Sequence, residues 1–194
     1  PPSGRSGRDI LMIFDGSGSV GQANFHNMLK AGATLAADIL ANGKNKVGAM
    51  IFPAGYHASP ITSSYSTVKN WLDSRKFPSG GTPTQVAFQR GAAWINRYVA
   101  KNGKIDKHIV IFTDGAPNNA PAALAAANSL KGQGFRITSI TITSSQSLVS
   151  QANKWASTPK GNNTYHIKNF QPLMTELGRS QFATAIFSKV CRGP

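Results

Sequence analysis

The chain has very few cysteines and acidic residues and no long apolar run, and each shortage excludes a class of protein. Its 194 residues include a single cysteine, Cys191, so no disulfide can form within the chain. If the protein is extracellular, the partner of Cys191 is expected beyond this segment or on another chain. No apolar run approaches the ~18 residues that a membrane-spanning helix needs. The four histidines are scattered, which does not predict a zinc site.

Basic residues greatly outnumber acidic ones. There are 21 Lys and Arg against 7 Asp and Glu, a formal net charge of +14. A charge of this size attracts polyanions such as nucleic acid, acidic membrane surfaces and sulfated glycans. The basic residues are spread in short groups rather than in one block, so a plain soluble basic surface and a polyanion-binding face both stay open. No sequence element typical of proteins that recognise nucleic-acid bases is present. We therefore predict no specific nucleic-acid partner, and we predict no membrane insertion.

The length suits a single domain, and a hydrophobic content of 40% is enough to build a core. The opening "PPSGRSGR", residues 1–8, is expected to be a flexible segment. We expect the domain itself to occupy 9–190 and a cut end to occupy 191–194. Asn162 begins a glycosylation sequon, "NNT", although a three-residue match does not show that it is used.

Apolar runs and amphipathic patterns alternate about six times along the chain. Strands are expected at 9–14, 46–52, 59–66 (a short edge strand and turn), 107–114, 135–143 and 164–170. Helices are expected at 23–40, 66–75, 84–100, 120–134, 148–157 and 173–190. The alternation predicts an α/β fold, with a doubly wound, mostly parallel sheet of about six strands and helices on both faces. In such sheets, ligands bind outside the carboxyl ends of the strands.

Three loops carry oxygen-bearing side chains at this expected edge. "DGSGS" supplies Asp15, Ser17 and Ser19, "GGTPT" supplies Thr82 and Thr84, and "FTDG" supplies Asp114. Both aspartates directly follow a buried strand, so the sheet can bring them side by side. The glycines between the first three residues let the backbone curl so that the side chains converge. Hydroxyl and carboxylate oxygens suit a hard cation, which predicts a site for Mg²⁺, with Mn²⁺ or Ca²⁺ as further candidates.

The first loop resembles the D-x-S-x-S motif of von Willebrand factor A domains, also called integrin inserted domains. Thr82 and Asp114 are similar to the separate threonine and aspartate ligands of that family. The resemblance covers nearly the whole chain, from Asp9 to about Val190. It implies the doubly wound fold that the alternation predicts independently, together with a metal-ion-dependent adhesion site.

The resemblance also implies roles for the five residues. Ser17 and Ser19 would bind the metal directly, while Thr82 and Asp114 would change between direct and water-mediated contact. Asp15 would hold coordinating water and the serine hydroxyls. In family members that switch, ligand binding is coupled to movement of the last helix, here expected at 173–190. Whether this domain switches stays open.

Enzymatic interpretations fit the same residues poorly. The hydrolase motif G-x-S-x-G fails because Asp15 stands two positions before Ser17. An aspartate-nucleophile phosphatase needs a second acid where Ser17 stands. No phosphate-binding glycine motif is present either. We therefore predict that the protein is not an enzyme and has no catalytic residues.

The residues and the resemblance together predict an extracellular or cell-surface adhesion module. It would bind a carboxylate of a protein ligand through Mg²⁺, and its basic surface would attract sulfated glycans. The terminal "FSKVC" and the basic surface are similar to the A domains of apicomplexan thrombospondin-related adhesins, which act in gliding motility and host-cell invasion. A domains of extracellular-matrix proteins fit nearly as well. A structural matrix protein that binds collagen or fibres, and a metal-independent, heparin-like polyanion-binding module, are the alternatives.

Overall fold

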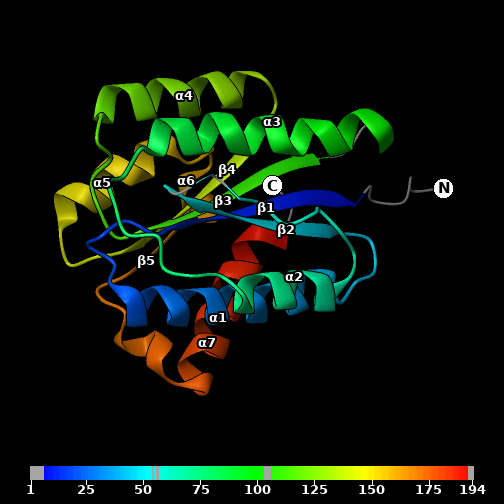
Figure 1. Ribbon diagram of the computed structural model, residues 1–194. Coiled ribbons are helices and arrows are strands. Elements are labelled where there is room, and N and C mark those ends of the chain that lie inside the picture. Colours follow the sequence, from blue (N-terminus) through cyan, green and yellow to red (C-terminus); the bar gives the residue numbers. More distant parts are fainter. Residues whose placement is uncertain (1–6, 54, 56, 103–105, 192–194) are drawn as a thin grey trace.

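A computed structural model describes residues 7–53, 55, 57–102 and 106–191, and Figure 1 shows the arrangement of its elements. Within these residues, five strands form one wholly parallel sheet in the order β2-β1-β3-β4-β5. The strands are β1 (Arg8–Asp15), β2 (Lys46–Phe52), β3 (Asp106–Thr113), β4 (Arg136–Ile142) and β5 (Thr164–Ile167). The predicted α/β class and doubly wound parallel sheet are confirmed.

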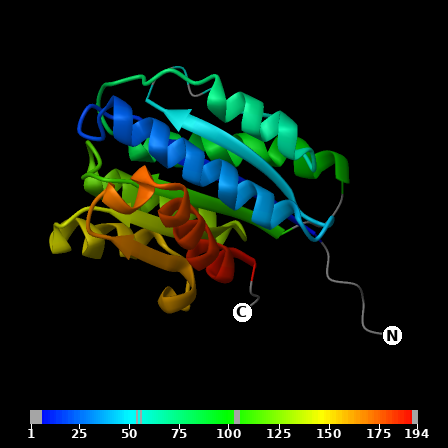
Figure 2. The same cartoon turned by 90° about the horizontal axis from the view of Figure 1, so that it is seen from below.

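Helices cover both faces of the sheet (Figures 1 and 2). One face carries α1 (Gln22–Leu40), α2 (Tyr65–Asp73) and α7 (Glu176–Cys191). The other carries α3 (Thr84–Asn102), α4 (Ala120–Gly132) and α5 (Gln146–Trp155). The short elements α6 (Lys160–Asn163) and η1 (Gln171–Met174) lie in the connections after α5 and β5. None of the helices in the described part of the chain has the length and apolarity needed to cross a bilayer.

Strand β1 lies near the middle of the sheet and packs on both sides. Ile10, Met12 and Phe14 belong to the core under α1 and α7, whereas Leu11 and Ile13 belong to the core under α3 and α4. All five side chains are fully buried. Since successive side chains of a strand point to opposite faces, burial on both faces requires an unbroken apolar run. This explains why the sequence "ILMIF" lacks the alternation of a half-exposed strand.

The order of the strands also determines where the loops with the predicted site residues leave the sheet. From β1 the chain crosses to β2 on one side, and it later returns to β3 on the other side of β1. The loops after β1 and β3 therefore leave neighbouring strands in different directions, which defines a switch point in the sheet. Asp15 ends β1, and Asp114 directly follows β3.

The expected edge strand at 59–66 is wrong in detail. Residues 58–62 make two isolated antiparallel bridges to β2, between Val47 and Thr62 and between Met50 and Ala58. Pro60 has no amide hydrogen to donate, so this segment cannot form a continuous ladder of hydrogen bonds with β2 at the outer edge of the sheet. Helix α2 then begins at Tyr65, where Ser64 caps it by accepting a hydrogen bond from the Thr67 amide.

Other boundaries also differ from the expectations. Strand β5 stops at Ile167 rather than at 170, and α7 begins at Glu176 rather than at 173, because the 3-10 turn η1, with Pro172 at its start, comes first. Helix α6 was not predicted, since four residues are too few to show a helical period. Strand β1 and helix α7 each extend one residue beyond the expected domain of 9–190. Residues 1–6 of the expected flexible segment and 192–194 of the expected cut end lie outside the described residues.

Gly32 offers a test of the packing between α1 and the sheet. A Cβ added there would overlap the ring of Phe14, whereas one added at Gly132, in the last turn of α4, would meet no atom within 4 Å. We expect Gly32→Ala to lower the free energy of unfolding by about 1–2 kcal/mol, because overpacking outweighs the helix propensity of alanine. Gly132→Ala is the control and should be neutral or slightly stabilising. Urea denaturation measures both, and an equal effect of the two substitutions would contradict the described packing.

Candidate metal centre

Three loops meet at the carboxyl edge of the sheet, on the left of Figure 1. The amide of Gly18, after β1, donates to the carbonyl of Gly80 at 2.9 Å. The amide of Asn118, after β3, donates to the carbonyl of Thr82 at 2.8 Å. The hydroxyl of Ser19 donates to Asp114 Oδ1 at 3.0 Å. Each pair of loops is thus joined by a hydrogen bond. The loop after β1, the segment before α3 and the loop after β3 together form one rim at the carboxyl edge of the sheet.

Asp15 lies at the base of this rim and is fully buried. Its Oδ1 accepts a hydrogen bond from the Ser17 amide at 2.8 Å, and its Oδ2 accepts one from Thr113 Oγ1 at 2.7 Å. Burial raises the pKa of Asp15, and the hydrogen bonds from Ser17 and Thr113 oppose that rise. Both carboxylate oxygens are therefore held from inside the protein, so Asp15 is placed to organise the loop above it.

Above Asp15, three side-chain oxygens form a continuous chain. Ser17 Oγ lies 3.2 Å from Ser19 Oγ, which in turn lies 3.0 Å from Asp114 Oδ1. Ser17 is buried, Ser19 is exposed and Asp114 is partly buried, so the chain runs from the interior to the surface. The sequence prediction that these residues converge describes this geometry correctly.

Thr82 reaches the rim through its backbone. Its amide donates to Asn118 Oδ1 at 2.9 Å, and its carbonyl accepts from the Asn118 amide at 2.8 Å. Within the described residues, no hydrogen bond joins the Thr82 hydroxyl to the other four predicted site residues. The structure therefore brings Asp15, Ser17, Ser19 and Asp114 into one hydrogen-bonded chain and places Thr82 beside it.

The close approach of the loops requires glycine at position 16. The Gly16 amide donates to the Phe52 carbonyl at 2.8 Å, and a Cβ at this position would overlap the ring of Pro78. A larger residue would push the segment that precedes Thr82 away from the first loop. The glycine thus serves contact between loops as well as local curvature.

The electrostatics of the rim favour a cation. The pKa of Asp114 is raised to about 6, chiefly by burial and then by the charge of Asp15, and the hydrogen bond from Ser19 opposes the rise. Within the described chain, the side-chain ion pairs join Arg8 to Asp106 and Lys69 to Asp73, so neither aspartate of the rim is paired with a basic residue. A cation bound here would stabilise the two neighbouring carboxylates, because they have no other counter-charge.

The donor set fits a hard divalent cation. The converging atoms are hydroxyl and carboxylate oxygens, the ligands that Mg²⁺, Mn²⁺ and Ca²⁺ share. No group of three or more His, Cys, Asp or Glu residues is placed to hold a metal in the part of the chain that the structure describes. The donor set therefore differs from that of a cysteine–histidine zinc site, and a cation held here would need hydroxyl ligands to complete its shell.

Two residues of the centre were missed by the sequence analysis. Thr113 fixes Asp15, and Asn118 fixes Thr82 through two hydrogen bonds. A hydroxyl at the end of a buried strand, just before Asp114, was a weak signal for Thr113. Asn118 gave no signal, because its contact spans 36 residues and the asparagine lies in a loop typical of ordinary turns.

The sequence model of the von Willebrand factor type A domain family matches residues 9–179. The chain belongs to this family. It is 33% identical over 175 residues to the mouse protein "Sushi, von Willebrand factor type A, EGF and pentraxin domain-containing protein 1", an alignment that covers 84% of this chain and 5% of that protein. It is also 33% identical over 123 residues to mouse von Willebrand factor A domain-containing protein 2, covering 61% and 15%. The chain thus spans a small part of these relatives.

Solved structures show the same fold at lower identity. Proximal thread matrix protein 1 from the mussel byssus superposes with a TM-score of 0.76 at 20% identity, over 96% of this chain and 48% of that one. A form of that protein described as having a zinc-occupied MIDAS motif gives 0.75 at 18% identity, with the same coverage. Manganese-loaded TRAP protein from Plasmodium vivax gives 0.65 at 20% identity, over 93% and 72%.

The support that Thr113 gives to Asp15 can be tested with a pair of matched substitutions. Thr113→Val keeps the shape but leaves a buried carboxylate oxygen without its partner, so the free energy of unfolding should fall by about 1–3 kcal/mol. Thr141→Val is the control, because its buried hydroxyl has no partner among the described residues. That substitution should be neutral or stabilising. Equal losses in urea denaturation would show that the Thr113–Asp15 bond contributes nothing specific.

The raised pKa of Asp114 predicts a pH effect on the metal-free domain. An acid whose pKa is higher in the folded state binds protons more tightly when folded, so stability falls as pH rises from about 4 to above 6. After allowance for partial exposure, the loss is about 1–2 kcal/mol. Buried His108, whose pKa is well below its usual value, acts in the opposite direction.

The comparison of the wild type with Asp114→Asn removes the contribution of His108. In chelator, urea denaturation across this pH range should show the free energy of unfolding of the variant, relative to that of the wild type, rising by about 1–2 kcal/mol from pH 4 to pH 7. Parallel curves for the two proteins would show that Asp114 is not perturbed by its surroundings.

Proposed function

We propose that the domain is an extracellular or cell-surface adhesion module that binds a carboxylate of its partner through a divalent cation, with Mg²⁺ as the first candidate. Ser17, Ser19, Thr82 and Asp114 would hold the cation. The observation that carries this proposal is the chain of hydroxyl and carboxylate oxygens above buried Asp15, in which neither aspartate has a basic partner within the described residues.

The burial of the site residues suggests a division of roles. Asp15 and Ser17 are enclosed and fixed, so they would set the position of the shell. Ser19 is exposed and Asp114 is partly exposed, so a ligand can reach this side of the rim from solvent. When bound, the cation supplies the positive charge that accepts a carboxylate oxygen. Among the described residues, Asp114 is the one partly exposed carboxylate at this side, so the cation would keep enough positive charge to bind an acid of the partner.

The relatives support a metal-dependent adhesive role without identifying the ligand. Domains of this family are generally adhesion or interaction modules, and we propose no catalytic role here. Two of the similar structures carry zinc and manganese respectively, which supports a divalent cation of unspecified identity. Their names point to two settings: a thread matrix in the mussel byssus and the TRAP protein of Plasmodium vivax. Gliding motility and host-cell adhesion remain the first setting we propose for this chain, and matrix assembly the second.

The net charge of +14 favours an additional attraction to sulfated glycans. A structural matrix role and a metal-independent polyanion-binding role are distinguishable from the main proposal by the response to chelation. Collagen or matrix binding that survives chelator would favour the structural role. Heparin binding that is lost in salt but unaffected by chelator would favour the polyanion-binding role.

The test is a binding screen of the intact domain against collagens, heparin and cell surfaces, in Mg²⁺ and in chelator. We expect at least one protein ligand whose binding falls at least about tenfold in chelator and in Asp114→Ala, because both remove the cation that the ligand's acid would contact. Asp73→Ala, which removes an exposed acid of α2, is the control and should bind as the wild type does.

A further inference from the structure

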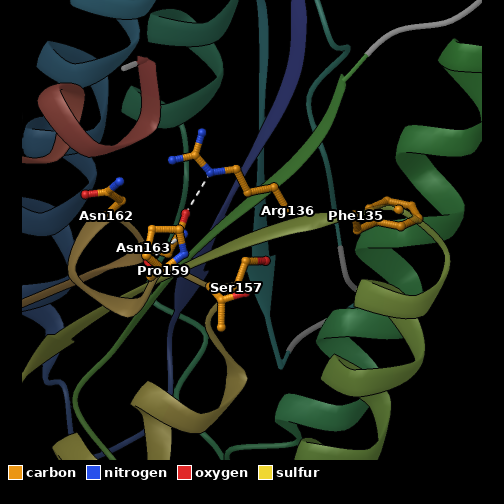
Figure 3. A pocket seen from close by; sticks show the side chains of 8 residues that line it. Phe135, Arg136, Ser157, Pro159, Asn162 and Asn163 are labelled. Atoms are coloured by element: carbon orange, nitrogen blue, oxygen red, sulfur yellow. Dashed lines mark hydrogen bonds between the residues drawn. The ribbon is translucent and has the colours of Figure 1, made fainter. Parts of the chain in front are cut away.

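The opposite edge of the sheet, where the strands begin, contains two adjoining cavities. One has a volume of about 260 Å³ and the other about 180 Å³, and both are lined by Gly134 and Arg136. Figure 3 shows the larger one, with the Arg136 side chain extending from β4 toward Asn163. The smaller one is also lined by Arg8, Asp106, Lys107 and His108. Each cavity exceeds the volume of several water molecules, about 30 Å³ each.

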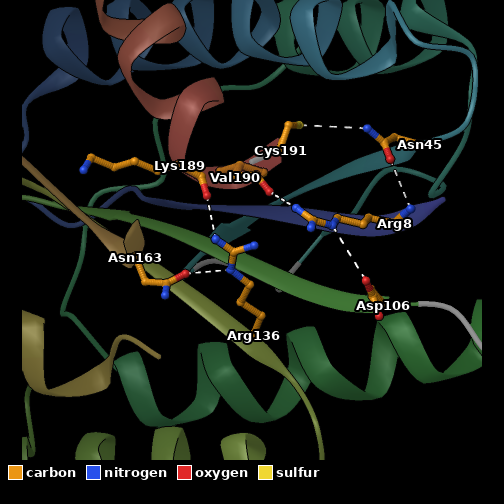
Figure 4. A network of polar contacts seen from close by, with 8 residues as sticks. All are labelled: Arg8, Asn45, Asp106, Arg136, Asn163, Lys189, Val190 and Cys191. Atoms are coloured by element: carbon orange, nitrogen blue, oxygen red, sulfur yellow. Dashed lines mark hydrogen bonds and ion pairs between the residues drawn. The ribbon is translucent and has the colours of Figure 1, made fainter. Parts of the chain in front are cut away.

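Two arginines from neighbouring parts of this edge approach the last turn of α7 (Figure 4). Arg136 donates from Nη2 to the carbonyl of Lys189 at 2.6 Å and from Nε to Asn163 Oδ1 at 2.6 Å. Arg8 donates from Nη1 to the carbonyl of Val190. Both guanidiniums therefore stabilise the C-terminal end of the helix, where exposed carbonyls favour positive charge.

These contacts do not neutralise the charge of the edge. Three basic side chains, Arg8, Lys107 and Arg136, line the smaller cavity. The acidic residue beside them is Asp106, whose side chain is 70% exposed and lies 3.8 Å from Arg8 Nε. Burial lowers the pKa of Arg136, and the nearby charge of Arg8 lowers it further because two cations repel each other.

The edge also retains hydrogen-bond donors. A guanidinium has five N–H groups. The contacts of Arg8 and Arg136 with the α7 carbonyls, Asn163 and Asp106 use only some of the N–H groups of the two side chains. His108 is fully buried against the cavity, and its Nδ1 has no partner among the described residues. The planar, fixed N–H groups of the two guanidiniums match the oxygens of a sulfate or phosphate group in geometry as well as in charge.

We propose that this edge is a second binding site, which takes a tetrahedral oxyanion: a sulfate or phosphate group, free or carried by a sugar. Arg8, Arg136 and Lys107 provide the positive charge. The site lies at the end of the sheet opposite the metal centre and does not depend on it, so one domain can bind an acidic protein ligand and an oxyanion independently.

Asp106 and Lys107 are the test positions, because Arg8 and Arg136 also hold the end of α7. Asp106→Asn removes the acid that competes for Arg8, and Lys107→Gln removes one of the cations. Matched controls are Asp73→Asn and Lys69→Gln, which make the same charge changes in an exposed ion pair on α2. The ligands are inorganic sulfate, inorganic phosphate and a fully sulfated heparin disaccharide, titrated by calorimetry.

We expect saturable binding of at least one of these anions, tightened about three- to tenfold by Asp106→Asn and weakened by a similar factor in Lys107→Gln. The two controls should stay near the wild type. Binding of inorganic sulfate or phosphate supports a site for the free group, and binding of the disaccharide alone supports a glycan-borne one. The absence of saturable binding, or equal effects of the test and control substitutions, would overturn the proposal.

Asp114→Ala separates this site from the proposed function. The variant should bind the oxyanion with unchanged affinity in Mg²⁺ and in chelator, even if its protein ligand is lost. A loss of oxyanion binding in Asp114→Ala would show instead that the anion occupies the metal centre, and would refute a second site.

Discussion

The hydrogen bond from Thr113 Oγ1 to Asp15 Oδ2 joins the ends of two adjacent strands, β3 and β1, and the proposed metal centre depends on it. It fixes a buried carboxylate at the point where β1 and β3 send their loops in different directions. From there the Ser17 amide, the Ser17 and Ser19 hydroxyls and the Asp114 carboxylate form a chain to the surface. The same arrangement partly buries Asp114 and places it close to Asp15 without a basic partner among the described residues. Burial first, and then the charge of Asp15, raise the pKa of Asp114, and the two acids together favour a cation.

The two ends of the sheet differ in charge, although the chain as a whole is strongly basic. Where β1 and β3 end, hydroxyls surround Asp15 and Asp114, which have no basic partner among the described residues. Where the strands begin, Arg8, Lys46, Lys107 and Arg136 outnumber Asp9 and Asp106. Since the strands are parallel, each edge gathers the residues at one end of every strand. A parallel sheet can therefore hold a cation site and an anion site apart without a second domain. The first of these is the cation site that we propose from the hydroxyl and carboxylate oxygens of the carboxyl edge, and the basic side chains of this particular chain suggest the second.

Much of the fold and of the centre could be predicted because its signals are local. The buried strands are unbroken apolar runs, and Asp15, Ser17, Ser19 and Asp114 stand directly after two of them. Thr82 needed the family resemblance, since a threonine among turn residues has no distinctive pattern. The hydrogen bonds of Asn118 with Thr82 and the electrostatic repulsion between Arg8 and Arg136 involve residues 36 and 128 positions apart, and only tertiary packing brings them together. Four-residue α6 and the two isolated bridges along β2 are too short to leave a periodic signal.

The most direct test of the central claim is a crystal structure of the intact domain grown with MnCl₂, with anomalous diffraction recorded to locate manganese. The account predicts one strong anomalous peak at the carboxyl edge of the sheet, within coordinating distance of the Ser17 and Ser19 hydroxyls and next to Thr82 and Asp114, while Asp15 keeps its bond to Thr113. An ordered rim without a manganese peak, or with the serine hydroxyls pointing away from Asp114, would contradict the claim that these loops form a cation site.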